Sequence, residues 1–213
     1  QFRKMSRSEY DDWDNFAITL GWDRIIISGV TKEGNRKYLG KTVTECVSEY
    51  GFADSEEVVC RLLNDEAGNV AIINLSMCQD DIDTVARLPY SIVISDAIYA
   101  DTDTPHPRMY GAFPKVIREY VCERHVLTLE QAVNKMTYLP ARRMKLKNRG
   151  LLKEGYFADV NIFSPDEFRD LATFDRPAQY ACGLFRSIIN GTVVVKDSEV
   201  VSLDAGKILK VEH

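Results

Sequence analysis

The chain has 213 residues, of which 45% are hydrophobic and 28% charged, a composition typical of folded globular proteins rather than disordered ones. Its 32 acidic and 27 basic side chains give a formal net charge of −5, and without a block of Lys or Arg we expect no nucleic-acid partner. No apolar run approaches the roughly 18 residues that a membrane span needs, so no membrane partner is expected. Because the sequence begins with Gln1 and carries no signal-peptide pattern, it is expected to be a piece of a longer chain.

Cysteine and histidine usage limits the metal chemistry of this segment. The five cysteines are odd in number and scattered, without C-x-x-C spacing, which indicates reduced thiols in a cytoplasmic protein rather than a disulfide framework. The three histidines are His106, His125 and His213. A multi-histidine metal cage therefore cannot be built from this segment alone.

The first two thirds of the chain alternate β-branched runs with helical patterns. Strands are predicted at 24–29, 69–74 and 90–96. Runs that are apolar on both faces favour a parallel sheet covered by helices. Capping signals at Thr42 and Asp54 predict the starts of two intervening helices. The β–α–β–α–β order therefore predicts a parallel α/β architecture.

Further helices and then strands are predicted after the third strand. A helix is expected over 76–88, between the second and third strands, and apolar residues at the helical period predict another around 113–121. Thr128 is expected to cap a helix whose inward face carries Leu129, Ala132, Val133 and Met136. From about residue 151 the pattern changes to alternating strands, and Asn190-Gly191 predicts a tight hairpin. The last ~60 residues are thus expected to form a small antiparallel β unit.

The candidate site lies at the predicted strand ends, where parallel α/β folds bind ligands. The side chains there are Ser28, Asn74, Ser76, Ser95 and Asp96. Asp96 is the ionisable one, and it could act as a general base, bind a metal or cap the following turn. The residue types alone leave these three roles open.

Several segments together resemble one enzyme family. They are Ser95-Asp96-Ala97, the run Pro105-His106-Pro107-Arg108-Met109-Tyr110-Gly111, residues 129–137 with Leu139-Pro140-Ala141, and the segment 154–163. This pattern resembles the D-aminoacylases, the N-acyl-D-amino-acid deacylases of the amidohydrolase superfamily. One departure is Ala97, where the family usually has Gly, and we expect a slightly stiffer turn there.

The resemblance implies a fold and a domain arrangement. The fold class is α/β: residues 1–150 would be the late strands and helices, the C-terminal part of a (β/α)8 TIM-type metallo-dependent hydrolase barrel. Residues 151–213 would be the C-terminal part of a small β domain. The remainder of the barrel, and the residues that hold the catalytic zinc, are expected upstream.

The resemblance also implies roles for four residues. Asp96 would be the general base that activates the zinc-bound water and passes the proton to the leaving amine. Arg108 would bind the carboxylate of a small-molecule N-acyl amino acid through its two-pronged guanidinium, with loop bracing as the alternative. Ser28 would add a hydroxyl contact or cap a turn, and His106 would touch substrate or steady the loop.

Other functions stay open at this point. A cyclic-amide hydrolase of the dihydroorotase or hydantoinase kind shares the segment around Ala158-Asp159 but gives no reason for the His106–Gly111 motif. A non-catalytic structural fragment, inactive on its own, is the alternative from a different class. The sequence does not fix the acyl group or whether the protein forms a homo-oligomer.

Overall fold

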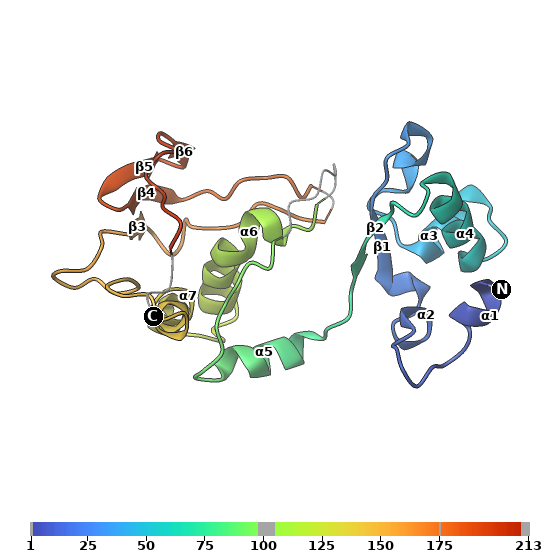
Figure 1. The fold of residues 1–213 in the computed structure, drawn as a ribbon, viewed down its shortest axis with the longest axis horizontal. Coiled ribbons are helices and arrows are strands. Elements are labelled where there is room, and N and C mark those ends of the chain that lie inside the picture. Colours follow the sequence, from blue (N-terminus) through green and yellow to red (C-terminus); the bar gives the residue numbers. More distant parts are fainter. Residues whose placement is uncertain (1, 98–104, 175, 210–213) are drawn as a thin grey trace. The chain divides into compact units, whose positions relative to one another are not determined.

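The computed structural model describes residues 2–97, 105–174 and 176–209, which divide into two compact units (Figure 1). The first unit is Gln1–Cys78 with the short segments 98–106 and 174–178. The second unit is Gln79–Ala97, Pro107–Thr173 and Gln179–His213. The predicted boundary at residue 150, between barrel and small β domain, stays a prediction.

The first unit contains a two-stranded sheet, with helices before the first strand and between the two strands. Its elements are α1 (Phe2–Ser6), α2 (Phe16–Thr19), the 3₁₀ helix η1 (Trp22–Arg24), β1 (Ile25–Gly29), the 3₁₀ helix η2 (Glu33–Tyr38), α3 (Val43–Tyr50), α4 (Ser55–Asp65) and β2 (Ala71–Asn74). Both predicted caps are confirmed. Thr42 forms a capping box with Glu45 at the start of α3, and Asp54 accepts the Glu57 amide at the start of α4. Helix α3 ends at Gly51, whose φ of 69° is readily adopted by glycine.

The pairing of β1 with β2 differs from the prediction. The two strands are antiparallel, with Ile25 opposite Asn74 and Ile27 opposite Ile72, so the predicted parallel pairing of these runs is wrong. A run of β-branched residues indicates a buried strand, but it carries no information about the direction of its neighbour. The register shifts between Ile27 and Gly29, at Ser28.

The core of the first unit lies between the sheet and helices α3 and α4, which Figure 1 shows beside the strands. Its buried hydrophobic members are Ile25, Ile27, Tyr38, Val43, Cys46, Val58 and Leu62. Burial raises the pKa of the Cys46 thiol to about 11, which keeps it protonated and unreactive at neutral pH. Cys46 is therefore a packing residue.

The second unit begins with helices. They are α5 (Gln79–Arg87), α6 (Arg108–Lys115), the π-helix η3 (Val116–Glu123), α7 (Leu129–Met136) and α8 (Tyr138–Arg143). The predicted capping of α7 by Thr128 is confirmed as a capping box with Gln131. On the predicted inward face of α7, Ala132 is buried but Val133 is exposed, and Lys135 is buried instead.

The third predicted strand, 90–96, is not formed in the described structure. Its apolar composition suits a strand, but a strand also needs a neighbouring backbone to bind. Here the Val93 amide donates to the carbonyl of Lys135 in α7 at 3.2 Å. Tertiary contact with a helix has replaced the expected sheet pairing in this segment.

The C-terminal region forms the expected antiparallel sheet. Its strands are β3 (Val160–Phe163), β4 (Leu184–Ile189), β5 (Thr192–Lys196) and β6 (Glu199–Val200), in the order β3-β4-β5-β6. Asn190 and Gly191 have φ values of 49° and 84°, which confirms the tight hairpin predicted from that pair.

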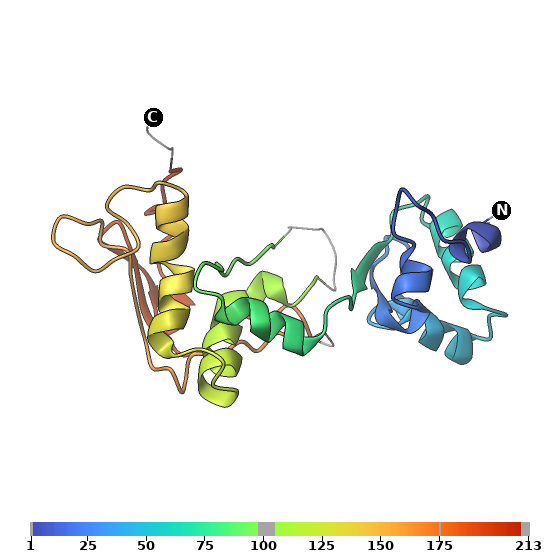
Figure 2. The ribbon, with the colours of Figure 1, turned by 90° about the horizontal axis from the view of Figure 1, so that it is seen from below.

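The second unit has its own core, centred on the helices that Figure 2 shows in green to yellow. The buried members are Val116, Ile117, Val126, Leu127 and Ala132, and Phe163 of β3 packs against them with Phe168. The core therefore ties the first strand of the sheet to η3 and α7. None of the helices in the described part of the chain has the length and apolar character needed to cross a bilayer.

Candidate functional site

Asp96 and Arg108, 12 residues apart in the chain, meet in the second unit. Nη2 of Arg108 lies 3.0 Å from Oδ2 of Asp96, with side chains 40% and 63% exposed. An exposed ion pair of this kind adds little to stability because water and salt screen it. The pair therefore offers a carboxylate and a guanidinium, side by side, to solvent and to solutes.

The backbone at Asp96 is in the left-handed region, with φ of 45°. Asp is among the few residues other than Gly that adopt this conformation readily. Ala97, which the structure describes, is not among the residues with positive φ. The replacement of Gly by Ala at 97 is thus compatible with the turn, because the left-handed residue is the one before it.

Arg108 is the first residue of α6, which leads directly into η3, and Asp170 contacts both helices. Asp170 accepts hydrogen bonds from Nε and Nη2 of Arg118 at 2.6 and 3.3 Å, and this raises the pKa of Arg118. Asp170 also packs against α6 at Gly111, where a Cβ atom would lie 2.6 Å from the Cβ of Asp170. Gly111 therefore permits the close approach, a function that the sequence motif alone did not reveal.

Ser28 and His106 belong to the first unit. Ser28 is buried at the irregularity in β1, and His106 is half-buried with its ring edge-on to Phe174 at 5.5 Å. Asn74, another predicted strand-end residue, has a buried Oδ1 without a donor among the described residues. The structure brings Asp96 and Arg108 together, while the roles of Ser28 and His106 stay predictions.

The donor set of this segment does not suit a metal ion by itself. Within residues 2–97, 105–174 and 176–209 there is no group of three or more His, Cys, Asp or Glu side chains that could hold one. Asp96 contacts a guanidinium, and a second cation would compete with it. A site with three or more such protein ligands would therefore need at least one ligand from outside these ranges.

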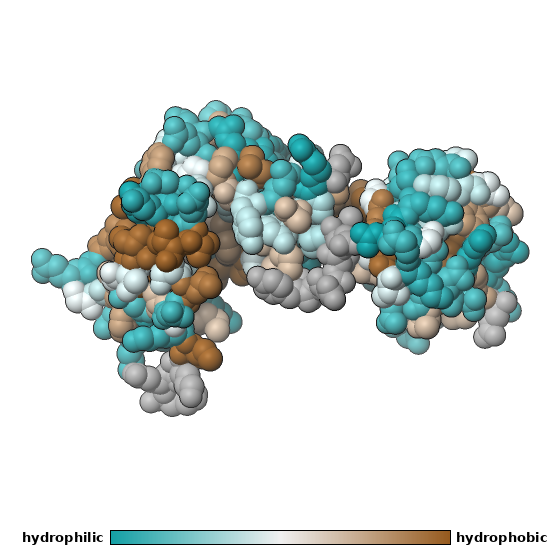
Figure 3. All heavy atoms as spheres, turned by 90° about the horizontal axis from the view of Figure 1, so that it is seen from above, coloured by the Kyte–Doolittle hydropathy of each residue, from teal (hydrophilic) through white to brown (hydrophobic). Residues whose placement is uncertain are grey.

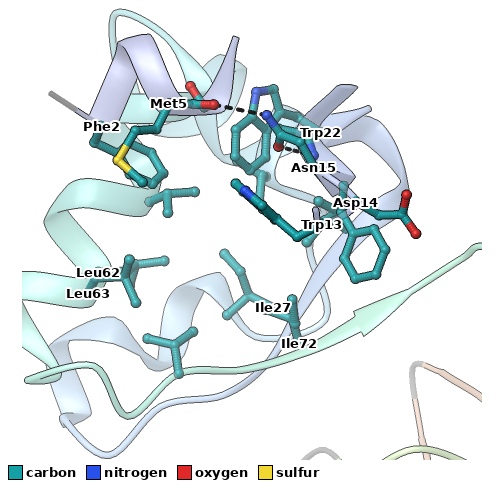
Figure 4. Close-up of a pocket in the computed structure, with 17 residues that line it drawn as sticks. Phe2, Met5, Trp13, Asp14, Asn15, Trp22, Ile27, Leu62, Leu63 and Ile72 are labelled. Carbon is teal, nitrogen blue, oxygen red and sulfur yellow. Dashed lines mark hydrogen bonds between the residues drawn. The ribbon is translucent and has the colours of Figure 1, made fainter. Parts of the chain in front are cut away.

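A separate cavity of about 440 Å³ lies in the first unit (Figure 4). Its lining is almost wholly apolar, including Trp13, Trp22, Ile27 and Leu62, and the Asn15 amide that Figure 4 draws is already bonded to the Met5 carbonyl at 2.9 Å. Ligand sites usually combine an apolar wall with convergent polar groups that are available to the ligand. This cavity has few such polar groups, and none of the four predicted site residues lines it. It is therefore not our candidate for the active site.

Comparisons with known proteins identify similar sequences. A model described as the amidohydrolase family matches residues 62–195. The N-acyl-D-aspartate deacylase of Alcaligenes xylosoxydans xylosoxydans is 36% identical over 162 residues, covering 76% of this chain and 31% of the relative. The D-aminoacylase of the same organism is 31% identical over 197 residues, covering 91% of this chain and 39% of the relative.

Solved structures of deacylases also match this chain. A crystal structure of D-aminoacylase matches with a TM-score of 0.78 and 29% identity, over 92% of this chain and 39% of that one. N-acyl-D-glutamate deacylase from Bordetella bronchiseptica, complexed with zinc and a phosphonate inhibitor, matches with a TM-score of 0.70 and 34% identity, over 81% of this chain and 34% of that one. The chain thus spans between 31% and 39% of the length of these relatives.

Proposed function

The chain belongs to the amidohydrolase family, and on that premise we propose that it supplies the proton-transfer and carboxylate-binding groups of a hydrolase acting on N-acyl-D-amino acids. The likeness to solved structures of D-aminoacylase and N-acyl-D-glutamate deacylase confirms the predicted fold class, the C-terminal part of a TIM-type α/β barrel followed by part of a small β domain. The antiparallel β1–β2 pair is a local departure within that class.

The observation that supports the proposal is the 3.0 Å contact between Asp96 and Arg108. In an N-acyl amino acid, the free carboxylate and the scissile amide nitrogen are both attached to the α-carbon. A group that binds the carboxylate and a group that protonates the nitrogen must therefore lie close together. Asp96 and Arg108 meet this requirement.

In the proposed reaction, Asp96 accepts a proton from the attacking water and later donates it to the departing amine. Arg108 binds the substrate carboxylate with two parallel N–H donors, a geometry that favours Arg over Lys. The substrate carboxylate competes with Asp96 for the guanidinium. Binding would therefore release the Asp96 oxygens for the attacking water, so that substrate prepares the base that acts on it.

Zinc is the proposed cofactor, since one relative is described in complex with it. Bound zinc would lower the pKa of water to about 7. The described residues of this chain supply no complete ligand set. The zinc ligands are therefore expected in the remainder of the barrel, and the roles given to Asp96 and Arg108 concern only proton transfer and substrate binding.

Ser28 and His106 are proposed as additional substrate-binding residues. For Ser28 the role requires its hydroxyl to reach the ligand from a buried position, and for His106 it requires the ring to contact ligand as well as Phe174. We further propose a cytoplasmic location, which fits five cysteines that are all free. The proposed partners are the small-molecule substrate and, in a homo-oligomer, further copies of the protein.

The test is to supply the zinc-loaded full-length protein with matched substrates. These are an N-acetyl-D-amino acid, its L-enantiomer and a cyclic amide such as hydantoin, with release of the free amine or opening of the ring measured. We expect hydrolysis of the D-compound in preference to the other two. Ring opening of the cyclic amide without hydrolysis of the D-compound would favour a hydantoinase-like enzyme, and no hydrolysis of any of the three would favour a structural role.

A further inference from the structure

Lys135, near the end of α7, is buried although lysine side chains normally reach solvent. The residue is 4% exposed. The ammonium donates to the carbonyl of Leu88, to the carbonyl of Ser91 at 3.3 Å and to Oγ of Ser91 at 2.8 Å. These partners are neutral oxygens, and burial lowers the pKa of Lys135.

All of these partners lie in the segment that leads from α5 to Asp96. Leu88 follows the last residue of α5, where a cation interacts favourably with the carbonyl end of the helix. The Ser91 hydroxyl donates to the same Leu88 carbonyl at 3.0 Å. Lys135 thus binds both the end of α5 and the start of the extended segment.

The backbone of Lys135 holds the same segment at a further point. Its carbonyl accepts the Val93 amide at 3.2 Å. Asp96 follows three residues later, a stretch that reaches at most about 10 Å. Since residues 91–97 form neither helix nor strand, the contacts with Lys135 take the place of regular hydrogen bonding in holding this part of the chain.

We propose that Lys135 is a positioning residue for Asp96. By binding the segment at Leu88, Ser91 and Val93, it fixes the place at which the Asp96 carboxylate meets Arg108 and the attacking water. The proposal rests on the proposed function of Asp96 as the general base. It assigns no contact between Lys135 and substrate.

Packing alone does not account for a lysine at this position. Burying an ammonium is costly, and it is tolerated only where hydrogen bonds compensate. A methionine of similar length would fill the same volume without that cost. The distinctive contribution of the lysine is the set of directed hydrogen bonds to one segment.

The experiment compares Lys135→Met and Lys135→Arg with Lys145→Met in the zinc-loaded full-length protein. Lys145 is exposed and serves as the matched control for the same substitution. Amide hydrogen exchange of peptides covering 90–97 reports the anchoring directly, without reference to activity. Steady-state kinetics on an N-acetyl-D-amino acid report its consequence, with kcat and KM obtained separately.

For Lys135→Met we expect exchange in 90–97 to accelerate roughly tenfold or more, as loss of hydrogen bonds to a charged group implies. We expect kcat to fall about 100-fold, the effect of a base displaced by about 1 Å, with KM nearly unchanged because Arg108 remains. Lys135→Arg should recover part of both losses, because it keeps a charged donor. Lys145→Met should change neither.

Unchanged exchange in Lys135→Met would overturn the proposal, as would faster exchange with a normal kcat, which would make the lysine purely structural. If Lys135→Met does not fold, Ser91→Ala removes one acceptor and leaves the lysine in place. It should then show smaller changes in the same direction, and no change in either measurement would overturn the proposal. If the wild-type protein does not hydrolyse N-acyl-D-amino acids, the proposed function fails, while the exchange data still decide whether Lys135 fixes this segment.

Discussion

Individual residues of the candidate site were predictable to different degrees. Asp96 and Arg108 could be found from the sequence because their residue types and flanking motifs are distinctive. Their 3.0 Å contact could not, since hydrophobic periodicity does not encode the path of the chain between them. Lys135 was missed because lysine is ordinarily assigned to the solvent face, although it lies three residues from the buried Ala132 and so on the same side of α7.

Replacement of Arg108 tests carboxylate recognition at the residue scale. Arg108→Lys keeps the charge but loses the paired donors, so kcat/KM should fall for substrates with a free carboxylate. An N-acyl amine without the carboxylate should be hydrolysed almost as well by the variant as by the wild type. Steady-state kinetics on the two substrates check this, and equal losses on both would rule out the carboxylate-binding role.

The pH dependence of stability tests the hydrogen bonds that the Glu66 carboxylate accepts. Burial alone would raise the pKa of this carboxyl, but hydrogen bonds from Thr31, Asn35 and the Lys32 amide outweigh it and lower the pKa to about 2. The folded-state pKa lies below the ordinary value near 4.3. The contribution of ionised Glu66 to the stability of the fold is therefore present above about pH 4.3 and is lost as pH falls towards 2.

Glu66→Gln should therefore lower the unfolding temperature at pH 7 and reduce its dependence on pH between about 4.3 and 2. The thermal unfolding midpoint, measured across that range, reports both effects. Glu9→Gln, at an exposed site of the same unit, is the control. An unfolding temperature for Glu66→Gln equal to that of the control at pH 7 would contradict the assigned network.

At the scale of elements, features set by neighbouring residues were predicted from the sequence more often than features set by contacts between distant residues. The threonine caps of α3 and α7 were predicted correctly because the cap and its partner lie within four residues. The direction of β2 was not, because it depends on a pairing across more than 40 residues. The π-helix η3 was also missed, since its residues show the periodicity of an ordinary helix.

Replacement of Gly111 tests the close contact between α6 and Asp170. A methyl group in Gly111→Ala would meet the Cβ of Asp170 at 2.6 Å, so either α6 or Asp170 must move. We expect a loss of about 1–3 kcal/mol in stability, together with reduced kcat/KM through displacement of Arg108. Gly34→Ala, where no atom lies within 4 Å, is the control. Denaturant unfolding measures the difference, and a variant as stable as the control would show that the contact is not tight.

At the scale of the whole molecule, the second unit exposes many hydrophobic side chains. Figure 3 shows hydrophobic residues gathered on part of its surface. Near the end of the chain the large exposed ones include Val200, Val201, Leu203 and Ile208, with Leu203 and Ile208 86% and 92% exposed. Large exposed apolar surface of this kind is typical of sites that are covered by other protein.

We therefore expect the isolated 213-residue chain to self-associate. Sedimentation velocity over a range of concentrations should show species heavier than the monomer. Leu203→Lys and Ile208→Lys together should shift the distribution towards monomer, while lysines at the already polar Ser202 and Asp204 should not. A monodisperse wild-type monomer at all concentrations would contradict this expectation.

For the molecule as a whole, we propose that this chain provides the general base of an amidohydrolase. The kcat of Asp96→Asn in the zinc-loaded full-length protein, on an N-acetyl-D-amino acid, tests it most directly. The amide accepts no proton at neutral pH, so kcat should fall by about 10² to 10⁴-fold while circular dichroism and zinc content stay unchanged. A kcat within a few-fold of the wild-type value would contradict the assignment of Asp96 as the base.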